Sequence, residues 1–451
     1  MMRTLGIDIG TTSICAVVLS ESGEVLEAVN TDNNAFVKTA APYERIQDPD
    51  IILARVFELA DFLSEKHAPI SGIGFSGQMH GILYLNGEGR AVSPLYTWQD
   101  GRGDLIFRDG KTYAQALSEI TGYRLATGFG SVTHYYNKIN GLVPEDAKVF
   151  CTIHDYAAMS FAGRKTPLVH VSDGASLGLF DLEKGKFDSA AIKTAGMDFA
   201  MFPNITYECE ILGKTAGDIP VASAIGDNQA SFAGSVSEDE TSILVNIGTG
   251  SQISLFSPEP SKSIALETRP FTKDGYLLVG SSLCGGRAYA LLEEFFRSVV
   301  RAAGFECKTM YPVMDRLSEG FETLENELEV KTLFSGTREN PDVRGSISNL
   351  CADNFTPEHF VAGVLWGIVN ELYEKYAAGA QQTGRAKTLV ASGNGVRKSP
   401  VMRRMLEKKF GMEIKIPLHK EEAACGAALF AMATTGVCTD LASARSTIKY
   451  A

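Results

Sequence analysis

The residues best suited to chemistry lie near the start of the chain, in the stretch LGIDIGTTS at residues 5–13. Apolar residues alternate there with Gly and Asp, which predicts a half-buried strand with Asp8 on its open face. The Gly, Thr and Ser turn that follows presents backbone N–H groups and hydroxyls, which bind anions such as phosphate. Asp8 would repel phosphate itself, but it can hold Mg²⁺, through water, and this ion can bind phosphate oxygens. We therefore expect Asp8 to be a metal ligand and the turn residues Thr11, Thr12 and Ser13 to bind phosphate.

A second stretch of the same design, LVNIGTGS, lies at residues 244–251. A single turn of this kind is most often an ordinary tight hairpin. Two copies, one in each half of the chain, favour a shared function over two unrelated hairpins. We expect the second turn, formed by Gly248, Thr249 and Gly250, to bind the same phosphate chain from a second domain.

The pattern around the first turn predicts an antiparallel meander of strands. Apolar runs at residues 14–19 and 25–29 flank the sequence ESGE at 21–24, which is typical of a hairpin turn. An amphipathic helix is predicted at 49–66, with Pro49 near its start. The residues expected on its apolar face are Ile52, Val56, Leu59, Phe62 and Leu63.

The second half of the chain repeats this order of elements. Residues 241–258 have the pattern of strand, Gly-Thr turn and strand. A long helix is predicted farther on, with Thr356 as its cap and Pro357 at its first position. Its expected apolar stripe is Val361, Leu365, Ile368 and Leu372, and the elements expected after it are a strand at 388–392, a glycine turn, a helix at 400–410 and a strand at 413–417.

Two similar half-chains indicate an internal duplication, and hence two related α/β domains with a cleft between them. A chain of 451 residues is also too long for one ordinary core. The acidic stretch VSEDET at 236–241 is the expected hinge. We therefore place an N-terminal domain at residues 1–237 and a C-terminal domain at residues 238–451.

Composition restricts the classes of partner. The formal net charge of −12 argues against nucleic acid or an anionic membrane, and the longest apolar runs are far too short to span a bilayer. Eight single cysteines without a C-x-x-C pair indicate reduced thiols rather than disulfides or a zinc site. Asp8 stands where a secretory signal needs an apolar core, so we expect a cytoplasmic protein.

Three stretches imitate known motifs but favour other interpretations. GIGFSG at 72–77 has the spacing of a dinucleotide-binding loop, but the residues after it predict a turn and a strand instead of a helix. GKT at 213–215 lacks the first glycine of a phosphate loop and is interpreted as a surface turn. The His-Asp pair in HDYAAMSFAG at 154–163 comes without a serine-nucleophile motif, so core packing explains it better.

Six motifs, in order along the chain, resemble those of the FGGY carbohydrate kinases: GIDIGTTS, GFSGQMHG, TWQDGR, AIGDNQASFAGS, NIGTGSQ and ASGNGVRKSPVMRRML. Together they extend over nearly the whole chain. The resemblance implies an α/β protein of two actin-like (ribonuclease H-like) ATPase domains, with ATP and Mg²⁺ as cofactors. Within the family the chain is most similar to the sedoheptulokinases and next to the xylulokinases.

The resemblance also implies roles for individual residues. It makes Asp227 the catalytic base and, with Asp8, a metal ligand. The positions implied for substrate binding are Gln78, Met79, His80, Trp98, Asp100, Asp227 and Asn228. Those implied for ATP binding are Thr11, Thr12, Ser13, Gly248, Thr249, Gly250, Gly393 and Asn394.

A carboxylate suits the role implied for Asp227, because the attacking sugar hydroxyl must lose its proton as it joins the γ-phosphoryl group. On spacing alone, an Asp-Asn turn cap explains Asp227 equally well. His, Gln and Asp match the polar groups of a polyol, and Met and Trp match its C–H faces, whereas a lone His80 or Trp98 is more often a core residue. Met79 and His80 stand where glycerol kinases carry Arg-Glu, which favours a ketose over glycerol.

These residues predict a kinase that transfers the γ-phosphoryl group of ATP to the terminal primary hydroxyl of a ketose. Segments 281–296 and 333–350 resemble those of sedoheptulokinases and favour sedoheptulose, with xylulose or another pentulose as the alternative. A non-enzymatic, actin-like ATP-binding switch is the rival from another class, and it would not need the sugar residues. The expected partners are a small-molecule ketose and ATP, without nucleic acid or membrane. A homodimer stays open, because many relatives dimerise and no sequence stripe marks an interface.

Overall fold

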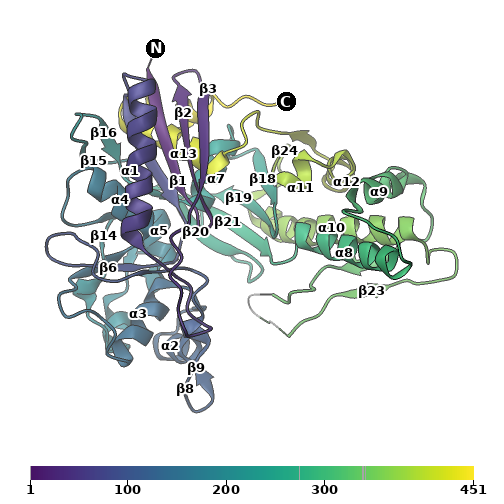
Figure 1. Ribbon diagram of the computed structural model, residues 1–451, viewed down its shortest axis with the longest axis horizontal. Helices are drawn as coiled ribbons and strands as arrows, with labels where there is room; N and C mark the ends of the chain where they lie inside the picture. The colour runs from purple at the N-terminus through teal and green to yellow at the C-terminus, as the bar shows by residue number, and fades with distance from the viewer. Residues whose placement is uncertain (1, 274, 338–339, 341) are drawn as a thin grey trace. The chain divides into compact units, whose positions relative to one another are not determined.

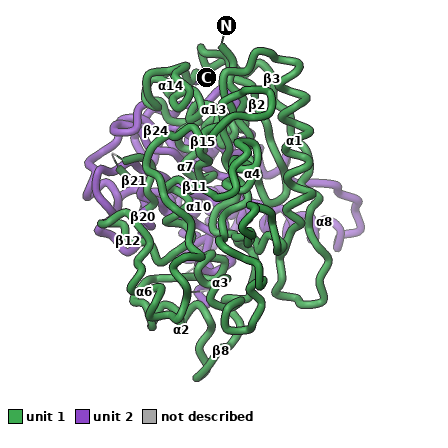
Figure 2. The backbone as a smooth tube through the Cα atoms, turned by 90° about the vertical axis from the view of Figure 1, so that its left-hand side faces the viewer, with its two compact units in different colours: residues 1–237, 269–275, 421–449 green, residues 238–268, 276–420, 450–451 purple. Residues whose placement is uncertain are grey.

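The computed structural model describes residues 2–273, 275–337, 340 and 342–451, so residues 338, 339 and 341 of segment 333–350 lie outside the described residues. The chain forms two compact units (Figure 1 and Figure 2). Unit 1 comprises residues 1–237, 269–275 and 421–449, and unit 2 comprises residues 238–268, 276–420 and 450–451. The first boundary falls within the acidic stretch 236–241. The functional domains expected at 1–237 and 238–451 stay a prediction.

Unit 1 contains a seven-stranded sheet that includes the predicted meander. β1 (Arg3–Ile9), β2 (Ser13–Ser20) and β3 (Val25–Asp32) pair in antiparallel order, which confirms the predicted hairpins. On its other side β1 pairs in parallel with β5 (Gly72–Gly77), and β5 pairs in parallel with β17 (Ile225–Gly226). Three parallel strands therefore end at the same edge of the sheet.

The GIGFSG stretch is β5 itself, so its glycines lie in a strand and not in a loop. A turn then leads to β6 (Leu83–Leu85), as predicted. The interpretation of residues 213–215 as a surface turn is wrong for Gly213 and Lys214, which belong to β15 (Ile211–Lys214) and pair with β16 (Pro220–Ala222). Leu212 is the only buried residue of β15, so no alternating pattern marked this strand in the sequence.

The predicted helix at 49–66 is confirmed as α1 (Pro49–Lys66), whose first N–H groups donate to the side chain of Asp48. Ile52, Val56 and Leu63 are buried as expected, but Phe62 is 51% exposed. Successive residues are rotated by about 100° around a helix, so Phe62 lies about 100° from Leu63 and outside the buried stripe. The placement of Phe62 on the apolar face is therefore wrong.

Helix α13 (Glu422–Thr434) packs directly on the sheet of unit 1, in yellow beside the purple strands in Figure 1. A Cβ atom added to Gly6 of β1 would lie 2.0 Å from the backbone oxygen of Ala424, and one added to Gly74 of β5 would lie 2.0 Å from that of Ala427. The prediction of a half-buried β1 is wrong for Thr4 and Gly6, which are buried on the second face of the strand, whereas Asp8 on that face is only partly buried. The cover comes from a helix more than four hundred residues away in the sequence.

Unit 2 repeats the strand pairing of unit 1. β18 (Ser242–Ile247) pairs in antiparallel order with β19 (Ser251–Ser257) and in parallel with β24 (Thr388–Ser392). β24 in turn pairs in parallel with β25 (Glu413–Lys415). The predicted strand–turn–strand segment and the two later strands are confirmed, although β25 ends earlier than expected.

The predicted long helix is confirmed as α10 (Pro357–Thr383), and the Thr356 side chain accepts a hydrogen bond from the His359 backbone N–H. The stripe formed by Val361, Leu365, Ile368 and Leu372 is buried. The predicted helix at 400–410 is confirmed as α12 (Pro400–Phe410). A further short helix, α11 (Asn394–Arg397), lies in the expected glycine turn.

The remaining elements of unit 1 are mostly short. They are β4 (Ile46–Gln47), β7 (Leu95–Tyr96), β8 (Ile106–Arg108), β9 (Lys111–Thr112), α2 (Tyr113–Thr121), α3 (Gly130–Ile139), β10 (Val149–Cys151), α4 (Ile153–Phe161), β11 (Leu168–His170), α5 (Val171–Ser176), β12 (Phe180–Asp181), β13 (Lys186–Phe187), α6 (Ser189–Thr194), β14 (Asn204–Thr206), α7 (Asp227–Ser235) and α14 (Leu441–Arg445). The strands and α-helices not yet named between residues 267 and 348 are β20 (Glu267–Thr272), β21 (Gly275–Ser282), α8 (Gly286–Ala302), α9 (Tyr311–Ser318), β22 (Glu329–Lys331) and β23 (Ser346–Ser348).

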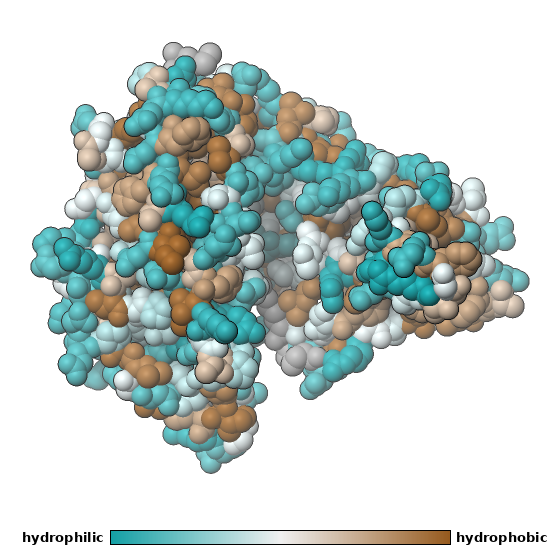
Figure 3. Space-filling view, viewed as in Figure 1, coloured by the Kyte–Doolittle hydropathy of each residue, from teal (hydrophilic) through white to brown (hydrophobic). Residues whose placement is uncertain are grey.

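The surface of each unit mixes hydrophilic and hydrophobic residues, as Figure 3 shows for one face. This agrees with the composition of the sequence, in which 45% of the residues are hydrophobic and 21% are charged. Within the described part of the chain, the structure contains no helix with the length and apolar character that a membrane span requires.

The contact between β5 and α13 predicts a specific stability effect. We expect Gly74→Ala to lower the free energy of unfolding by about 1–3 kcal/mol, because the added methyl group must displace the backbone of α13. Gly217→Ala is the matched control, since its Cβ would lie 3.7 Å from the Thr215 hydroxyl. Urea denaturation followed by circular dichroism measures both variants. Equal stability of the two variants would contradict the proposed packing role of Gly74.

Candidate active site

The carboxyl ends of β1, β5 and β17 bring three predicted site segments to one edge of the unit 1 sheet. The register pairs Asp8 with Ser76, Ser76 with Ile225, and Gly77 with Gly226. The residues that follow these strands are Gly10–Thr12, Gln78–His80, and Asp227 with Asn228. Ligands of open α/β sheets bind beside the carboxyl ends of parallel strands, so this edge is the candidate site.

The first turn is held from behind by donors that belong to none of the sequence motifs. Asn33 Nδ2 donates to the Gly10 carbonyl at 2.8 Å, and the Asn33 backbone N–H donates to the Thr12 carbonyl at 2.8 Å. Gln47 Nε2 donates to the Thr11 carbonyl at 2.8 Å. In a trans peptide the N–H group points opposite to the carbonyl of the preceding residue. The N–H groups of Thr11 and Thr12 therefore point away from these donors, as an anion-binding turn requires.

Asp8 lies near the end of β1 and accepts a hydrogen bond from Ser76 Oγ of β5 at 2.9 Å. Burial is the main cause that raises the pKa of Asp8, and Glu421 adds to the effect, whereas Ser76 and His154 oppose it. A second carboxylate, Asp227, also lies near enough to interact with Asp8. The structure thus brings together the two residues predicted to bind a metal.

Asp227 is the first residue of α7, directly after β17. Its position is fixed through its neighbour Gly226, whose backbone N–H donates to Ser172 Oγ at 3.1 Å. Burial is the main cause that raises the pKa of Asp227 to about 7, and Asp8 adds to it, whereas Arg269 and His154 lower it. Asn228, the next residue, is buried in the same helix. A helix-start carboxylate with a raised pKa is suited to accept a proton.

A buried ion pair that the sequence did not reveal lies behind Asp227. His154 Nε2 of α4 lies 2.9 Å from Asp173 Oδ1 of α5, and both side chains are fully buried. Burial alone would lower the pKa of His154, but Asp173, and then Asp155 and Asp227, hold it at about 9. Core packing was the right interpretation of the burial of the His-Asp pair. The partner of His154 is nevertheless Asp173, which only the fold brings near.

The segment after β5 places Gln78, Met79 and His80 at the same edge. The His80 backbone has a φ of 72°, and its ring stacks on Phe129 with centroids 4.7 Å apart. His80 Nδ1 lies 2.7 Å from the Ser176 carbonyl oxygen, which can only accept, so Nδ1 carries the proton of the neutral ring. Met79 is buried, and its sulfur would lie 2.9 Å from a Cβ added to Gly226.

Trp98 and Asp100, the other predicted sugar residues, lie in different environments. Trp98 is 42% exposed, and its indole Nε1 donates to Thr11 Oγ1 at 3.0 Å. Asp100 is fully buried: Oδ1 accepts from Arg102 Nε at 2.6 Å, and Oδ2 accepts from the Arg45 backbone N–H at 3.0 Å. The Asp100 carboxylate therefore stabilises its own turn, and its contact with a sugar stays a prediction.

In unit 2 the second Gly-Thr turn connects β18 and β19 and packs against the start of α8. The backbone N–H groups of Gly286 and Arg287 donate to the Gly248 and Thr249 carbonyls, each at 2.9 Å. A Cβ on Gly286 would lie 2.4 Å from the Gly248 carbonyl oxygen. The segment 281–296, noted for its resemblance to sedoheptulokinases, thus supports the turn that contains Gly248, Thr249 and Gly250.

Gly393 and Asn394 lie beside this second turn. β24 ends at Ser392, next to Asn246 of β18, and Asn246 Nδ2 donates to Ser392 Oγ at 2.8 Å. Gly393 has a φ of 86°, and a Cβ there would lie 2.5 Å from the Ile247 carbonyl oxygen. The structure therefore brings together the five residues predicted for ATP binding in unit 2.

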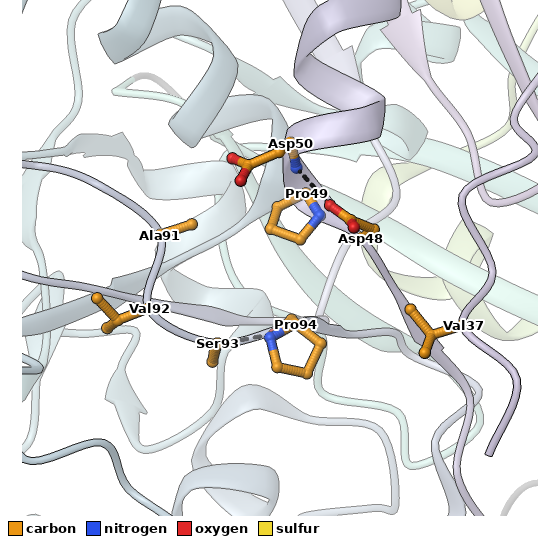
Figure 4. Close-up of a pocket in the computed structure, with 8 residues that line it drawn as sticks. All are labelled: Val37, Asp48, Pro49, Asp50, Ala91, Val92, Ser93 and Pro94. Carbon is orange, nitrogen blue, oxygen red and sulfur yellow. Dashed lines mark hydrogen bonds between the residues drawn. The ribbon is translucent and has the colours of Figure 1, made fainter.

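A pocket of about 290 Å³ lies apart from the predicted site residues, at the start of α1 (Figure 4). Its wall contains Asp48 and Asp50, and Asp48 Oδ1 accepts from the Asp50 backbone N–H at 2.9 Å. The residues that line it are Val37, Asp48, Pro49, Asp50, Ala91, Val92, Ser93 and Pro94. Two carboxylates without a basic residue make this pocket unsuited to a phosphate.

Solved structures with the same architecture identify the fold. A xylulose kinase from Lactobacillus acidophilus superposes with a TM-score of 0.85 at 20% identity, covering 100% of this chain and 93% of that one. A glycerol kinase from Plasmodium falciparum, solved with ADP, gives a TM-score of 0.82 at 21% identity, covering 99% and 92%. The chain thus has the two-domain α/β fold of sugar kinases, which confirms the predicted fold class.

Sequence comparison identifies the family. The model of the N-terminal domain of the FGGY family of carbohydrate kinases matches residues 3–234, and that of the C-terminal domain matches residues 243–435. The chain belongs to the FGGY family of carbohydrate kinases. A human sedoheptulokinase is 26% identical over 94% of this chain and 96% of its own length, and a gluconokinase of Bacillus subtilis is 23% identical over 96% and 87%. Membership of a kinase family favours an enzyme over the non-enzymatic switch.

Proposed function

We propose that this carbohydrate kinase transfers the γ-phosphoryl group of ATP to the terminal primary hydroxyl of a ketose, with sedoheptulose as the first substrate to test. The observation that carries the proposal is the shared edge of the unit 1 sheet, where the Gly-Thr turn, the partly buried Asp227 and the segment Gln78–His80 follow three parallel strands. The 26% identity to a sedoheptulokinase supports the choice of sugar. Xylulose is the alternative, favoured by the structural similarity to a xylulose kinase.

Asp227 is the proposed catalytic base. Its carboxylate accepts the proton of the sugar hydroxyl as the hydroxyl joins the γ-phosphoryl group, and a positioned base contributes about 10²–10⁴ in rate. Ser172 holds the backbone of Gly226, so α5 fixes where the base sits. His154 of the buried His154–Asp173 pair lowers the pKa of Asp227, which favours the ionised form of the base, whereas Asp173 opposes this effect.

Asp8 and Asp227 are the proposed ligands of Mg²⁺. Their carboxylate oxygens are the donors that Mg²⁺ prefers, and each lies in a buried environment whose negative charge a cation would offset. When bound, Mg²⁺ neutralises charge on the phosphate oxygens. Asp8 itself is oriented by Ser76, which keeps one carboxylate oxygen directed across the sheet.

The nucleotide and sugar residues complete the proposal. Thr11, Thr12 and Ser13 are the proposed phosphate-binding residues of unit 1, and Gly248, Thr249 and Gly250 are those of unit 2. Gly393 and Asn394 contact the adenosine. Gln78, Met79, His80, Trp98, Asp100 and Asn228 form the sugar site with Asp227, in which the polar groups bind hydroxyls and Met79 and Trp98 contact C–H faces.

The substrate is tested by coupling ADP release to a panel of sedoheptulose, xylulose, ribulose, fructose, gluconate and glycerol. We expect sedoheptulose to give the highest kcat/KM, because segments 281–296 and 333–350 resemble those of sedoheptulokinases and a sedoheptulokinase is among the sequence relatives. A higher kcat/KM for xylulose than for sedoheptulose would instead identify the protein as a pentulose kinase. If no sugar raises ADP release above the rate without sugar, the proposed function is wrong.

Asp227→Asn tests the assignment of the base. We expect kcat to fall by about 10²–10⁴, because the amide cannot accept the proton, while the affinity for ADP measured without Mg²⁺ stays nearly unchanged. Asp218→Asn is the matched control, since the Asp218 side chain is 83% exposed and pairs with Lys214 at the surface. Steady-state kinetics give kcat, and isothermal titration calorimetry without Mg²⁺ gives the affinity for ADP. A wild-type rate in the Asp227→Asn variant would remove Asp227 from this role.

A further inference from the structure

The hydroxyl of Thr11 joins the phosphate turn to the proposed sugar residues. Thr11 Oγ1 donates to Gln78 Oε1 at 3.1 Å and accepts from Trp98 Nε1 at 3.0 Å. The indole N–H is a donor only, so the direction of the second bond is fixed, and the one hydroxyl proton goes to Gln78. The first turn is thus bonded to two residues from two other loops of unit 1.

Gln47 closes this arrangement into a ring. Gln47 is fully buried in β4, and its Nε2 donates to the Thr11 carbonyl at 2.8 Å while its Oε1 accepts from Gln78 Nε2 at 2.9 Å. Both amide groups of this pair are therefore oriented by hydrogen bonds at each end. A closed ring of three hydrogen bonds among Thr11, Gln78 and Gln47 fixes the turn and the sugar residue relative to each other.

The strand that contains Gln47 also contacts the loop that carries Trp98. β4 pairs with β7, where Gln47 lies opposite Leu95, and Thr97 Oγ1 donates to the Arg45 carbonyl at 2.7 Å. The three loops that carry Thr11, Gln78 and Trp98 are thus connected through one short strand. None of the motifs in the sequence includes this strand.

The bond directions restrict how Thr11 can serve a phosphate. Phosphate oxygens are hydrogen-bond acceptors, so a residue that binds phosphate must donate. The hydroxyl proton of Thr11 is already given to Gln78, which leaves the backbone N–H as the donor that Thr11 offers to an anion. A sugar hydroxyl that bonds to Gln78 or Trp98 would compete for the hydrogen bonds that these residues make with the Thr11 hydroxyl. A sugar in this site would therefore alter the contacts that hold the first turn.

We propose that Thr11 and Gln47 are positioning residues that couple sugar binding to nucleotide binding through this ring. The proposal rests on the proposed function and adds the residues by which an occupied sugar site affects the phosphate turn. Such a coupling is reciprocal: sugar and nucleotide change each other's affinity by the same factor, typically about 5–150-fold. It gives the enzyme a means to bind ATP productively only when a sugar is present, which limits transfer of the phosphoryl group to water.

Thr11→Val tests the proposal, because valine keeps the shape of threonine and removes the hydroxyl. Isothermal titration calorimetry measures the dissociation constant of Mg·ADP without sugar and with saturating sedoheptulose, or with xylulose if the panel favours it. We expect the ratio of the two constants to be at least about 5 in the wild type and near 1 in the valine variant. Thr11→Ser is the matched control, since it restores the hydroxyl and is expected to recover most of the ratio.

Two further variants keep the test decisive if Thr11→Val does not fold. Trp98→Phe removes the indole donor at an exposed position, and Gln47→Met removes the hydrogen bonds of the Gln47 amide without burying a charge. Both are expected to lower the ratio and to raise the rate of ADP release without sugar relative to the rate with sugar. A general structural defect would instead lower both rates together.

The outcomes separate the two proposals. If the wild type phosphorylates sugar and the variants keep its ratio of dissociation constants, the coupling role of the ring is wrong and the proposed function stands. If the wild type shows neither sugar-dependent turnover nor a sugar effect on Mg·ADP binding, the proposed function fails and the coupling role fails with it.

Discussion

The parallel pairing of β1, β5 and β17 is the constraint on which the candidate site depends. These strands come from residues 3–9, 72–77 and 225–226, and only their register brings the residues after them to one edge. Helix α13 can pack directly on β1 and β5 because Gly6 and Gly74 have no side chains at the contact. The glycines of the N-terminal motifs therefore serve packing as well as the turn.

Electrostatics at this edge follow from the same arrangement. Asp173 is fully buried, Asp8 and Asp227 are partly buried, and His154 and Arg269 are the cations that lower the pKa of Asp227. Burial and mutual repulsion raise the pKa of Asp8 and of Asp227, because removal of water and a neighbouring negative charge both disfavour the ionised form. A site of this kind favours a cation or a proton, which agrees with a metal-assisted transfer in which one carboxylate acts as the base.

Periodicity and turn chemistry predicted the local elements well. The meander of β1 to β3, helix α1, the capped helix α10 and the turn between β18 and β19 all have strong local signals. The errors arose where long-range packing decides. Phe62 lies outside the buried stripe of α1, β15 has one buried residue, and the second face of β1 is covered by α13 from the far end of the chain.

The candidate site shows the same division. The residue types alone predicted the turns at Thr11 and Gly248 as candidate phosphate-binding turns. The family resemblance added Asp227, Gln78 and the residues of the Trp98 turn as candidate site residues. Asn33 and Gln47, which hold the first turn, carry no local signal because their function depends on pairing with distant loops. The same holds for the His154–Asp173 pair, whose members lie on two helices separated by a strand.

A crystal structure with Mg²⁺, a non-hydrolysable ATP analogue and the preferred sugar tests the central claim most directly. We predict that the metal and the terminal phosphate lie beside Asp8 and the backbone N–H groups of Thr11 and Thr12. The primary hydroxyl of the sugar is expected within hydrogen-bond distance of the Asp227 carboxylate. A terminal phosphate bound away from the carboxyl ends of β1, β5 and β17 would contradict the account.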